Sequence, residues 1–250
     1  MNLKIVNYKK LKNGMYTIKL EDSREITLYQ EVILEYELLL DKNIDNDKLV
    51  KINLLNKKWE VYYTALKILK SRFRSRKELF DLLIKKDFPS DLVSDSLDKL
   101  EKQGYINDLS FAKSYMNNQV LTTNRGPNRI SNDLLGKGVS VEIIEEVILE
   151  YDINLQREKI IKLVDKYLKS NRSRSGNVLK MKIINDLLKL GYDRSTILGV
   201  VDNMSFEMGD NFIKAEYEKL YRKYSRKYSG KELEYKIRQK LYQKGIVYED

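Results

Sequence analysis

LFDLLIKKDF, residues 79–88, decides the fold of this chain because it recurs three more times. The copies are ISNDLLGKGV at 130–139, IINDLLKLGY at 183–192 and IRQKLYQKGI at 237–246. Each copy opens on an apolar residue, carries leucine four places on, and reaches a turn residue eight places on, followed by another apolar residue. The turn residues lie 51, 53 and 54 positions apart and are Asp87, Gly138, Gly191 and Gly245. Such near-constant spacing predicts a repeat architecture, in which a surface recurs together with a core.

Each repeat is expected to contain three helices, which are clearest in the first copy. An apolar stripe predicts a helix over residues 59–71. Ser75, with Glu78 three places later, has the capping-box arrangement that begins a second helix. A third helix is expected to start near Pro89, where a fixed φ is tolerated, and to end at Gly104. Apolar residues six, ten and thirteen places past the turn indicate the same third helix in the next two copies.

The predicted fold is therefore mainly α-helical, with tandem three-helix repeats that form an elongated, curved array. A small N-terminal β-hairpin/α appendage precedes them, with strands over 4–8, 15–20 and 25–29 and helices over 30–40 and from about residue 46. The expected segments are the appendage at 1–55, full repeats at 56–106, 107–153 and 154–206, and a truncated fourth repeat at 207–250.

The composition narrows the function mainly by what is missing. The chain has 47 basic and 37 acidic residues, a formal charge of +10, which favours nucleic acid or an acidic protein surface as the partner. It has no histidine and no cysteine, so histidine-based catalysis, the usual zinc sites and thiol chemistry are excluded. A phosphate-binding G-x-x-x-x-G-K-[ST] loop is also absent from the sequence. We therefore expect a protein that is not an enzyme and that needs no metal and no cofactor.

Hydropathy and the amino-terminal pattern predict a cytoplasmic protein. No apolar run approaches the roughly 20 residues needed to span a bilayer. Residues 1–10 alternate charged and apolar side chains and lack the apolar block of a signal peptide. We expect a monomer that does not associate with membranes.

Basic residues recur at one position of every repeat, the junction between its first and second helices. We expect them to form a partner-binding stripe along one edge of the array, and the planar fork of arginine suits carboxylate or phosphate groups. The predicted binding residues are Lys70, Arg72, Arg74, Arg76, Lys77, Arg125, Arg129, Lys169, Arg172, Arg174, Arg222, Lys223, Arg226 and Lys227. Alternatively, these residues complement the negative carboxy-terminal end of the first helix, which accounts for one or two per junction but not for the five at the first.

Two other features are interpreted structurally. A stripe of tyrosines at helical spacing among the basic residues of the tail suits either base stacking or inward packing, and we favour inward packing. The stripe consists of Tyr217, Tyr221, Tyr224 and Tyr228. Asp108 is placed to cap the helix that follows it, with Phe111 and Tyr115 on the inner face of that helix.

Three segments at 69–88, 100–115 and 125–139 follow one another in an order that is typical of a known family. They fit the patterns Arg-x-Arg-Ser-x-x-Glu-Leu, Gly-Φ-x-Asp-x-x-Phe-Ala-x-x-Tyr and Gly-Pro-x-x-Ile…Leu…Lys-Gly-Φ. The matching residues are Arg72, Arg74, Ser75, Glu78 and Leu79, then Gly104, Asp108, Phe111, Ala112 and Tyr115, then Gly126, Ile130, Leu134, Lys137 and Gly138. In this, the chain resembles the RecX family of recombinase regulators. It departs at Asp87, where the family has glycine, and at Asn118-Gln119, where an arginine is common.

The resemblance implies a non-enzymatic regulator of the RecA recombinase. Such a protein binds the RecA–DNA filament along its groove and modulates, typically inhibits, filament growth, ATPase activity and strand exchange in DNA repair and recombination, within the SOS response. A repetitive protein with a basic edge suits a repetitive filament because several weak contacts add through multivalency. The alternative is a protein that binds single- or double-stranded DNA directly, through helix-turn-helix-like units.

Overall fold

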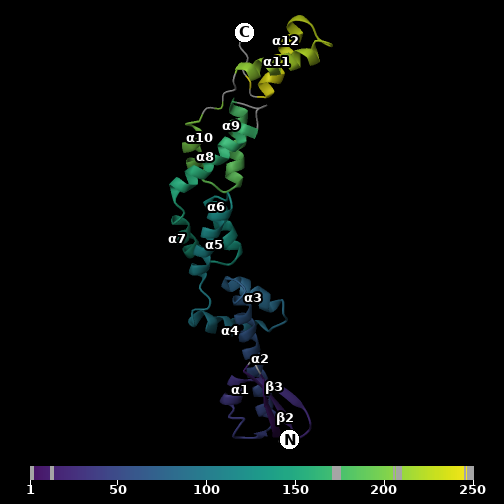
Figure 1. Cartoon of the computed structure of the whole chain (residues 1–250), viewed down its shortest axis with the longest axis vertical. Helices are drawn as coiled ribbons and strands as arrows, with labels where there is room; N and C mark the ends of the chain where they lie inside the picture. Colours follow the sequence, from purple (N-terminus) through teal and green to yellow (C-terminus); the bar gives the residue numbers. More distant parts are fainter. Residues whose placement is uncertain are drawn as a thin grey trace. The chain divides into compact units, whose positions relative to one another are not determined.

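The computed structural model describes residues 3–11, 14–170, 176–204, 206, 210–244 and 246. The chain forms two compact units, of which the first comprises Met1–Phe111 with Lys137–Ser140 and the second the remainder. Helices dominate both units, as Figure 1 shows. The mainly α-helical fold with a small N-terminal sheet is therefore confirmed, whereas the elongated, curved array and the predicted segment boundaries stay predictions.

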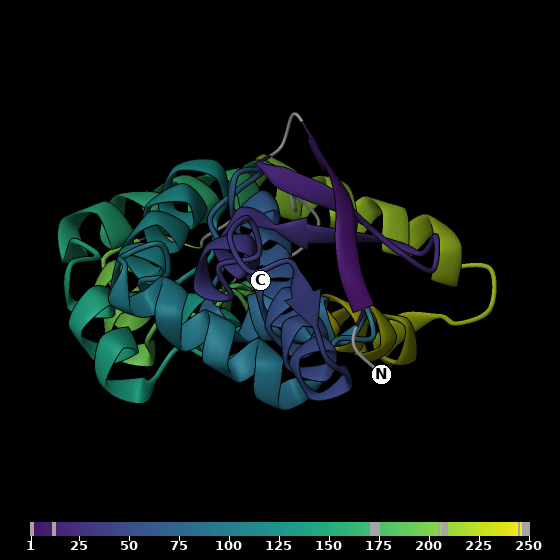
Figure 2. The same cartoon turned by 90° about the horizontal axis from the view of Figure 1, so that it is seen from below.

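The first unit begins with a four-stranded antiparallel sheet in the order β3-β2-β1-β4. Its strands are β1 (Leu3–Lys10), β2 (Met15–Leu20), β3 (Glu25–Tyr29) and β4 (Asn43–Ile44). Figure 2 shows the long strands in purple, the colour of the start of the chain. The sheet shares a core with the short helix α1 (Gln30–Glu35) and the first half of α2 (Asn46–Leu69), formed by residues such as Ile18, Val32 and Ile52. The three predicted strands are confirmed, and β4 is an additional short strand.

The helix predicted over residues 30–40 is shorter than expected, because α1 ends at Glu35. Glu37 adopts a φ of +47°, a left-handed conformation that cannot continue a right-handed helix. The N–H of Leu38 then donates to the carbonyl oxygen of Ile33 at 2.9 Å, which closes a Schellman turn. Leu38 is fully buried, so its packing fixes the point at which the helix stops.

α2 is one continuous helix, although the sequence suggested one helix from about residue 46 and another from about 59. Asp45 caps it, with its Oδ1 accepting from the N–H of Lys48 at 2.6 Å. Trp59 packs against both the core of the sheet and the core of the first repeat. The N-terminal module and the first repeat therefore share a helix.

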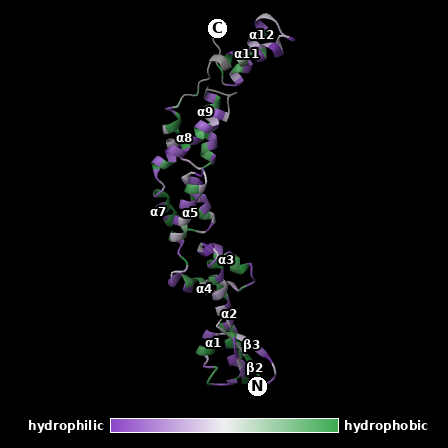
Figure 3. Ribbon diagram, in the orientation of Figure 1, coloured by the Kyte–Doolittle hydropathy of each residue, from purple (hydrophilic) through white to green (hydrophobic). Residues whose placement is uncertain are grey.

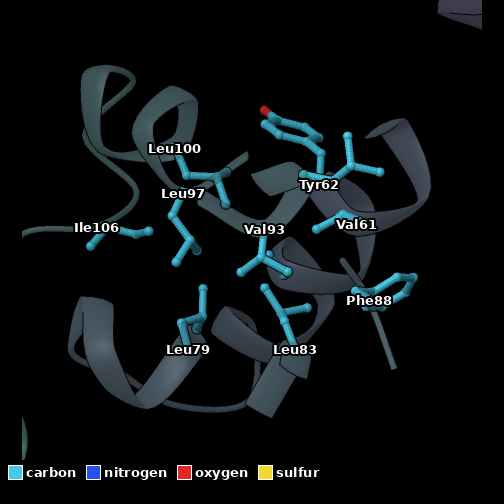
Figure 4. Packing of buried hydrophobic residues seen from close by; sticks show 11 residues of the cluster. Val61, Tyr62, Leu79, Leu83, Phe88, Val93, Leu97, Leu100 and Ile106 are labelled. Atoms are coloured by element: carbon cyan, nitrogen blue, oxygen red, sulfur yellow. The ribbon is translucent and has the colours of Figure 1, made fainter. Parts of the chain in front are cut away.

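The first repeat consists of α2, α3 (Arg76–Ile84) and α4 (Ser90–Lys102). Figure 4 shows the core between them, with Leu79 and Leu83 of α3 facing Val93 and Leu97 of α4. The Oγ of Ser75 accepts from the N–H of Glu78 at 3.1 Å and caps α3, as predicted.

The recurring segment ends in one type of hydrogen-bonded turn. The carbonyl oxygen of its leucine accepts from the N–H of the apolar residue five places on, at 3.4 Å in the first copy, 3.2 Å in the third and 3.0 Å in the fourth. The pairs are Leu83 with Phe88, Leu187 with Tyr192 and Leu241 with Ile246. The turn residues Asp87, Gly138 and Gly191 have φ of +61°, +80° and +92°, so Asp87 adopts the left-handed geometry of the glycines that it replaces. Gly245 lies outside the described residues.

The second unit contains the helices of the later repeats, except for the first turn of α5, residues 108–111, which belongs to the first unit. They are α5 (Asp108–Thr122), α6 (Pro127–Gly136), α7 (Val141–Leu149), α8 (Ile153–Ser170), α9 (Gly176–Lys189), α10 (Arg194–Val201), α11 (Asp210–Tyr224) and α12 (Gly230–Gln243). Figure 3 shows apolar and polar residues interspersed along these helices, as expected for elements that bury one face. Among the described helices, none combines the length and apolarity needed to cross a bilayer.

α11 and α12 pack on each other through a small core of their own that includes Leu220, Leu233 and Ile237. Three of the four stripe tyrosines, at 217, 224 and 228, pack against this core, which confirms inward packing for them. Tyr221 is 48% exposed, so the prediction is wrong for this residue. Its place one turn after Tyr217 puts it at the margin of the buried face.

A hydrogen bond joins the start of the second helix of one repeat to the turn of the next repeat. In the first unit, the Oγ of Ser75 donates to the carbonyl oxygen of Lys137 at 2.7 Å. In the second unit, the N–H of Gly126 donates to the carbonyl oxygen of Leu190 at 2.7 Å. Lys137 and Leu190 occupy the same position, one residue before the turn glycine, so the contact is as periodic as the sequence.

The close approach at this contact explains why the later turns need glycine. A Cβ on Gly138 would lie 2.5 Å from the Cβ of Lys77, and a Cβ on Gly191 would overlap the backbone nitrogen of Arg129. Asp87 belongs to the first repeat, which no earlier repeat precedes, and its side chain is exposed. Only the left-handed φ is demanded there, and aspartate satisfies it better than most residues.

Replacing Gly191 by alanine should lower the free energy of unfolding by at least about 2 kcal/mol, because the new Cβ adds both left-handed strain and overlap with Arg129. The matched control is Gly199→Ala in α10, where a Cβ meets nothing within 4 Å. The control should raise stability by about 0.5–1 kcal/mol. Urea unfolding followed by circular dichroism measures both, and equal effects would contradict the assigned role of the turn.

Candidate partner-binding surface

Arg76, one of the predicted binding residues, is used inside the first unit. Its guanidinium pairs with Asp98 of α4, and its Nη1 lies 2.8 Å from the carboxylate of Glu101. Its backbone N–H donates to the Oδ1 of Asp108 at 2.9 Å. Arg76 therefore ties α3 to α4 and to the start of α5, and its positive charge is already compensated.

Asp108 does not cap α5 as the sequence predicted. Asn107 caps that helix, with its Oδ1 accepting from the N–H of Ser110 at 2.8 Å, because α5 begins at residue 108 and the capping position is the one before it. Asp108 instead accepts from the first N–H of α3, which lacks a partner within its own helix. Burial raises the pKa of Asp108, and although the Arg76 N–H lowers it, the resulting pKa lies above the ordinary value.

An ion pair between Glu78 and Lys137 reinforces the junction of the first repeat. The Nζ of Lys137 lies 2.7 Å from the Oε1 of Glu78, and both side chains are largely buried. Burial alone would raise the pKa of Glu78. Lys137, the Ser75 backbone N–H and the nearby Arg72 together lower it by more than burial raises it, so the pKa lies below its usual range. The three family-like segments thus meet at one point, through Ser75 with Lys137, Glu78 with Lys137, and Asp108 with Arg76.

The second junction is built around Asp133 of α6. Its carboxylate pairs with the guanidinium of Arg125, lies 3.7 Å from the Nε of Arg129, and accepts from the hydroxyl of Tyr115 at 3.2 Å. Burial, and secondarily the charge of Asp133, raises the pKa of Tyr115. Both predicted binding residues of this junction therefore have a carboxylate partner, which sequence reasoning missed although Asp133 lies only eight and four residues after Arg125 and Arg129, a spacing that could have signalled the (i, i+4) pair.

Three basic residues of the first junction, Lys70, Arg72 and Arg74, form a group that we call the outward cations. Among the described residues, no carboxylate lies within ion-pairing distance of any of the three. Lys70 and Arg72 are exposed, and Arg74 is half-buried, with an Nε that is buried and has no hydrogen-bond partner in the described chain. Phe73, between the two arginines, is 67% exposed. This half of the junction faces solvent with charge that no ion pair neutralises.

The remaining predicted binding residues also divide into those that contact other residues of the protein and those that have no carboxylate partner. Arg222 lies 3.3 Å from Glu218 in an exposed pair that contributes little to stability, and the stem of Lys77 lies against Gly138. Four further cations are exposed and have no carboxylate partner within the described part of the chain: Lys169, Lys223, Arg226 and Lys227. Arg172 and Arg174 lie outside the described residues.

The chemistry of this surface is that of charge recognition. Guanidinium and ammonium groups without an ion-pair partner donate hydrogen bonds to carboxylate or phosphate oxygens. Within the described residues, carboxylates do not gather in a group of three or more that could hold a metal ion.

Two protein-family models match this chain. The model of the first three-helix domain of RecX matches residues 62–100, and the model of the second three-helix domain matches residues 107–148. The regulatory protein RecX of Listeria monocytogenes serotype 4b (strain CLIP80459) is 32% identical over 192 residues, which cover 77% of this chain and 71% of the relative. The regulatory protein RecX of Listeria welshimeri serovar 6b is 27% identical and covers 100% of this chain and 94% of the relative. A crystal structure of regulatory protein RecX has the same fold, with a TM-score of 0.73 at 24% identity over 80% of this chain and 100% of that chain.

Glu78→Gln should lower the free energy of unfolding by about 1 kcal/mol near neutral pH, because it removes the charge that pairs with Lys137. The folded-state pKa of Glu78 is depressed, so its contribution is present above the unfolded pKa and is lost as the pH falls through the folded pKa. The difference from the parent protein should therefore shrink below about pH 4. The exposed Glu145 of α7 offers a control, since Glu145→Gln should have little effect at any pH. Urea unfolding at a series of pH values measures the stability of both variants. If the difference between Glu78→Gln and the parent protein is the same in acid as at neutral pH, the effect comes from side-chain packing and not from the charge of Glu78.

Proposed function

The chain belongs to the RecX family, whose relatives are named regulatory proteins, and from this premise we propose that it regulates the RecA recombinase. In this proposal it binds the recombinase–DNA filament along its groove and inhibits filament growth, ATPase activity and strand exchange. The protein acts by binding and not by catalysis, as a monomer in the cytoplasm. The sites of contact are the basic residues of the surface that lack partners in the protein itself.

The observation that carries the proposal is the unpaired charge of the outward cations. Ser75 follows Arg74 directly, is fully buried and is hydrogen-bonded on both sides, so the loop that presents the cations is anchored at one end. An anchored arginine loses less conformational freedom on binding than a free one, and arginine is enriched among residues that dominate binding energy. These cations therefore support recognition of an acidic or phosphorylated surface.

The repeat architecture supports a repetitive partner. The second unit carries its own exposed cations without carboxylate partners in the described chain, at Lys169 and among residues 223–227, so more than one repeat can contribute a contact. Contacts that are weak singly become strong together when a partner offers them in series, as a filament of identical protomers does. The paired arginines at 76, 125 and 129 serve the architecture in this proposal and contribute little to binding.

The same cations would also suit the phosphates of naked DNA, which is the competing interpretation. A salt series separates the two because phosphate contacts release counterions and give a steep dependence of affinity on salt. Binding should be compared for bare single-stranded DNA and for the same DNA coated with recombinase. Equal affinity for both, with a steep salt slope, would overturn the proposal in favour of plain DNA binding.

The proposal predicts that the protein lowers the ATPase rate of the recombinase on single-stranded DNA when titrated into the reaction. Lys70→Glu combined with Arg72→Glu should raise the concentration needed for half-maximal inhibition by about tenfold or more. Neither side chain has an ion-pair partner in the described chain, and Arg72 acts on Glu78 only through a weaker, longer-range attraction, so the melting temperature should fall by only a few degrees.

The matched control reverses two exposed lysines of the same unit, Lys85 and Lys86, at the end of α3. It changes the net charge by the same amount but leaves the first junction intact, so inhibition should persist. Equal loss in both variants would reduce the effect to overall charge. An unchanged ATPase rate at saturating wild-type protein would overturn the proposed function itself.

A further inference from the structure

The first unit contains a cavity of about 320 Å³ where α1, α2 and α4 meet. It is lined by Leu55, Lys58, Trp59, Tyr62, Ser96 and Lys99, and we call it the Trp59 cavity. Its volume lies at the lower end of the range for ligand sites and gives room for one side chain. None of the predicted junction residues lines it, so it is a separate place on the molecule.

Lys99 places a positive charge in the wall of this cavity without a neutralising partner. Its Nζ lies 3.7 Å from the centroid of the Trp59 ring and 5.1 Å from that of Tyr62. Two aromatic faces hold the ammonium in place, but they satisfy none of its three N–H donors with an oxygen acceptor. In the described chain, no carboxylate lies within ion-pairing distance of it, whereas Lys58 beside it is paired with Asp95 at 2.8 Å.

Ser96 supplies a second polar group without a partner. The residue is 1% exposed, lines the cavity, and its Oγ has no hydrogen-bond partner among the described residues. Buried hydroxyl groups are nearly always hydrogen-bonded, so the absence of a partner for the Ser96 hydroxyl needs an explanation. Ser96 and Lys99 are three residues apart on α4 and therefore share a face of that helix.

We propose that the Trp59 cavity binds the carboxylate of a single aspartate or glutamate side chain presented by the protein partner. The carboxylate accepts a charge-assisted hydrogen bond from Lys99, while its methylene stem contacts Leu55 and the aromatic rings. The Ser96 hydroxyl, which is inaccessible in the free protein, donates a second hydrogen bond after its side chain rotates toward the cavity. This inference rests on the proposed function for the identity of the partner, which is the recombinase.

The surroundings favour one carboxylate over a phosphate chain. Glu35 lies at the cavity, and the outer face of α4 carries Asp91, Asp95 and Asp98. A polyanionic backbone laid across this surface would meet Glu35 and the three aspartates together, whereas one side chain entering the cavity meets Glu35 alone and has Lys99 at close range. Burial of the pair away from salt strengthens that single contact.

The test uses Trp59 as a reporter, since it is the only tryptophan in the chain. The full-length protein is labelled with 5-hydroxytryptophan, which can be excited apart from the tryptophan of other proteins, and mixed with recombinase-coated single-stranded DNA. Occupancy of the cavity should reduce quenching of this residue by acrylamide. Lys99→Met should weaken filament binding about tenfold, and Lys99→Arg, which keeps the charge, should restore most of it.

The matched control is Lys57→Met on the same helix as Trp59. Lys57 also lies over an aromatic ring, 4.9 Å from the centroid of Phe88, but it does not line the cavity. This control should bind the filament like the wild type, and Ser96→Ala should weaken binding without lowering the melting temperature. Filament binding by Lys99→Met that equals the wild type, with Trp59 quenching unchanged on binding, would overturn this inference and leave the proposed function standing.

A second arm decides the question if the wild type does not bind the filament at all, an outcome that counts against the proposed function. The labelled protein is titrated with a capped pentapeptide that has a central glutamate, and separately with its glutamine counterpart. The glutamate peptide should protect Trp59 saturably, in the wild type but not in Lys99→Met. Equal responses to the two peptides, or none to either, would overturn the carboxylate site.

Discussion

The structure depends on a hydrogen bond that recurs at equivalent positions of the repeats, donated by the Ser75 hydroxyl in the first unit and by the Gly126 N–H in the second, and accepted by a backbone carbonyl in both. The start of a second helix, at Ser75 or Gly126, donates to the carbonyl oxygen that precedes a turn glycine in the next repeat. For this bond to form, the turn must be left-handed and must carry no Cβ, because the incoming chain approaches within the space a side chain would fill. The constraint acts on the main chain, so side chains elsewhere in the repeat can vary while the spacing stays near 51 to 54 residues.

Electrostatics in this chain serve two purposes that the composition alone does not separate. Arg76 ties α3 to α4, whereas Arg125 and Arg129 pair with Asp133 of α6. The outward cations, a few residues from Arg76, carry charge that no ion pair in the described chain neutralises. The first junction thus contains a structural half, at Arg76, and an outward half that is available to a partner. The formal charge of +10 overstates the surface that is free to bind.

Much of the fold was accessible from the sequence because its signals are local. The strands follow alternation, α3 follows the Ser75 cap, and the turns follow the position of glycine or Asp87. The errors arose where distant residues decide. α1 stops early because Leu38 is buried in the sheet core, and Asp108 serves α3 and not its own helix. The sequence pattern is least informative about the surface residues, since a carboxylate such as Asp98 on another helix determines whether Arg76 is paired. The repeat pattern of the sequence did not indicate the Trp59 cavity, because the residues that line it come from three different helices.

The continuity of α2 bears on how the first unit folds. A helix of 24 residues is about 36 Å long, and its two halves supply one wall each to the sheet core and to the core of the first repeat. Neither core is complete without its half, and Trp59 lies against both. Loss of the sheet would expose the buried side of α2 to water, including Ile52, and so remove support from the helix on which the first repeat is built. The β-rich module and the first repeat therefore form a single cooperative folding unit, in which proteolysis or local unfolding at the amino terminus reaches the repeat as well.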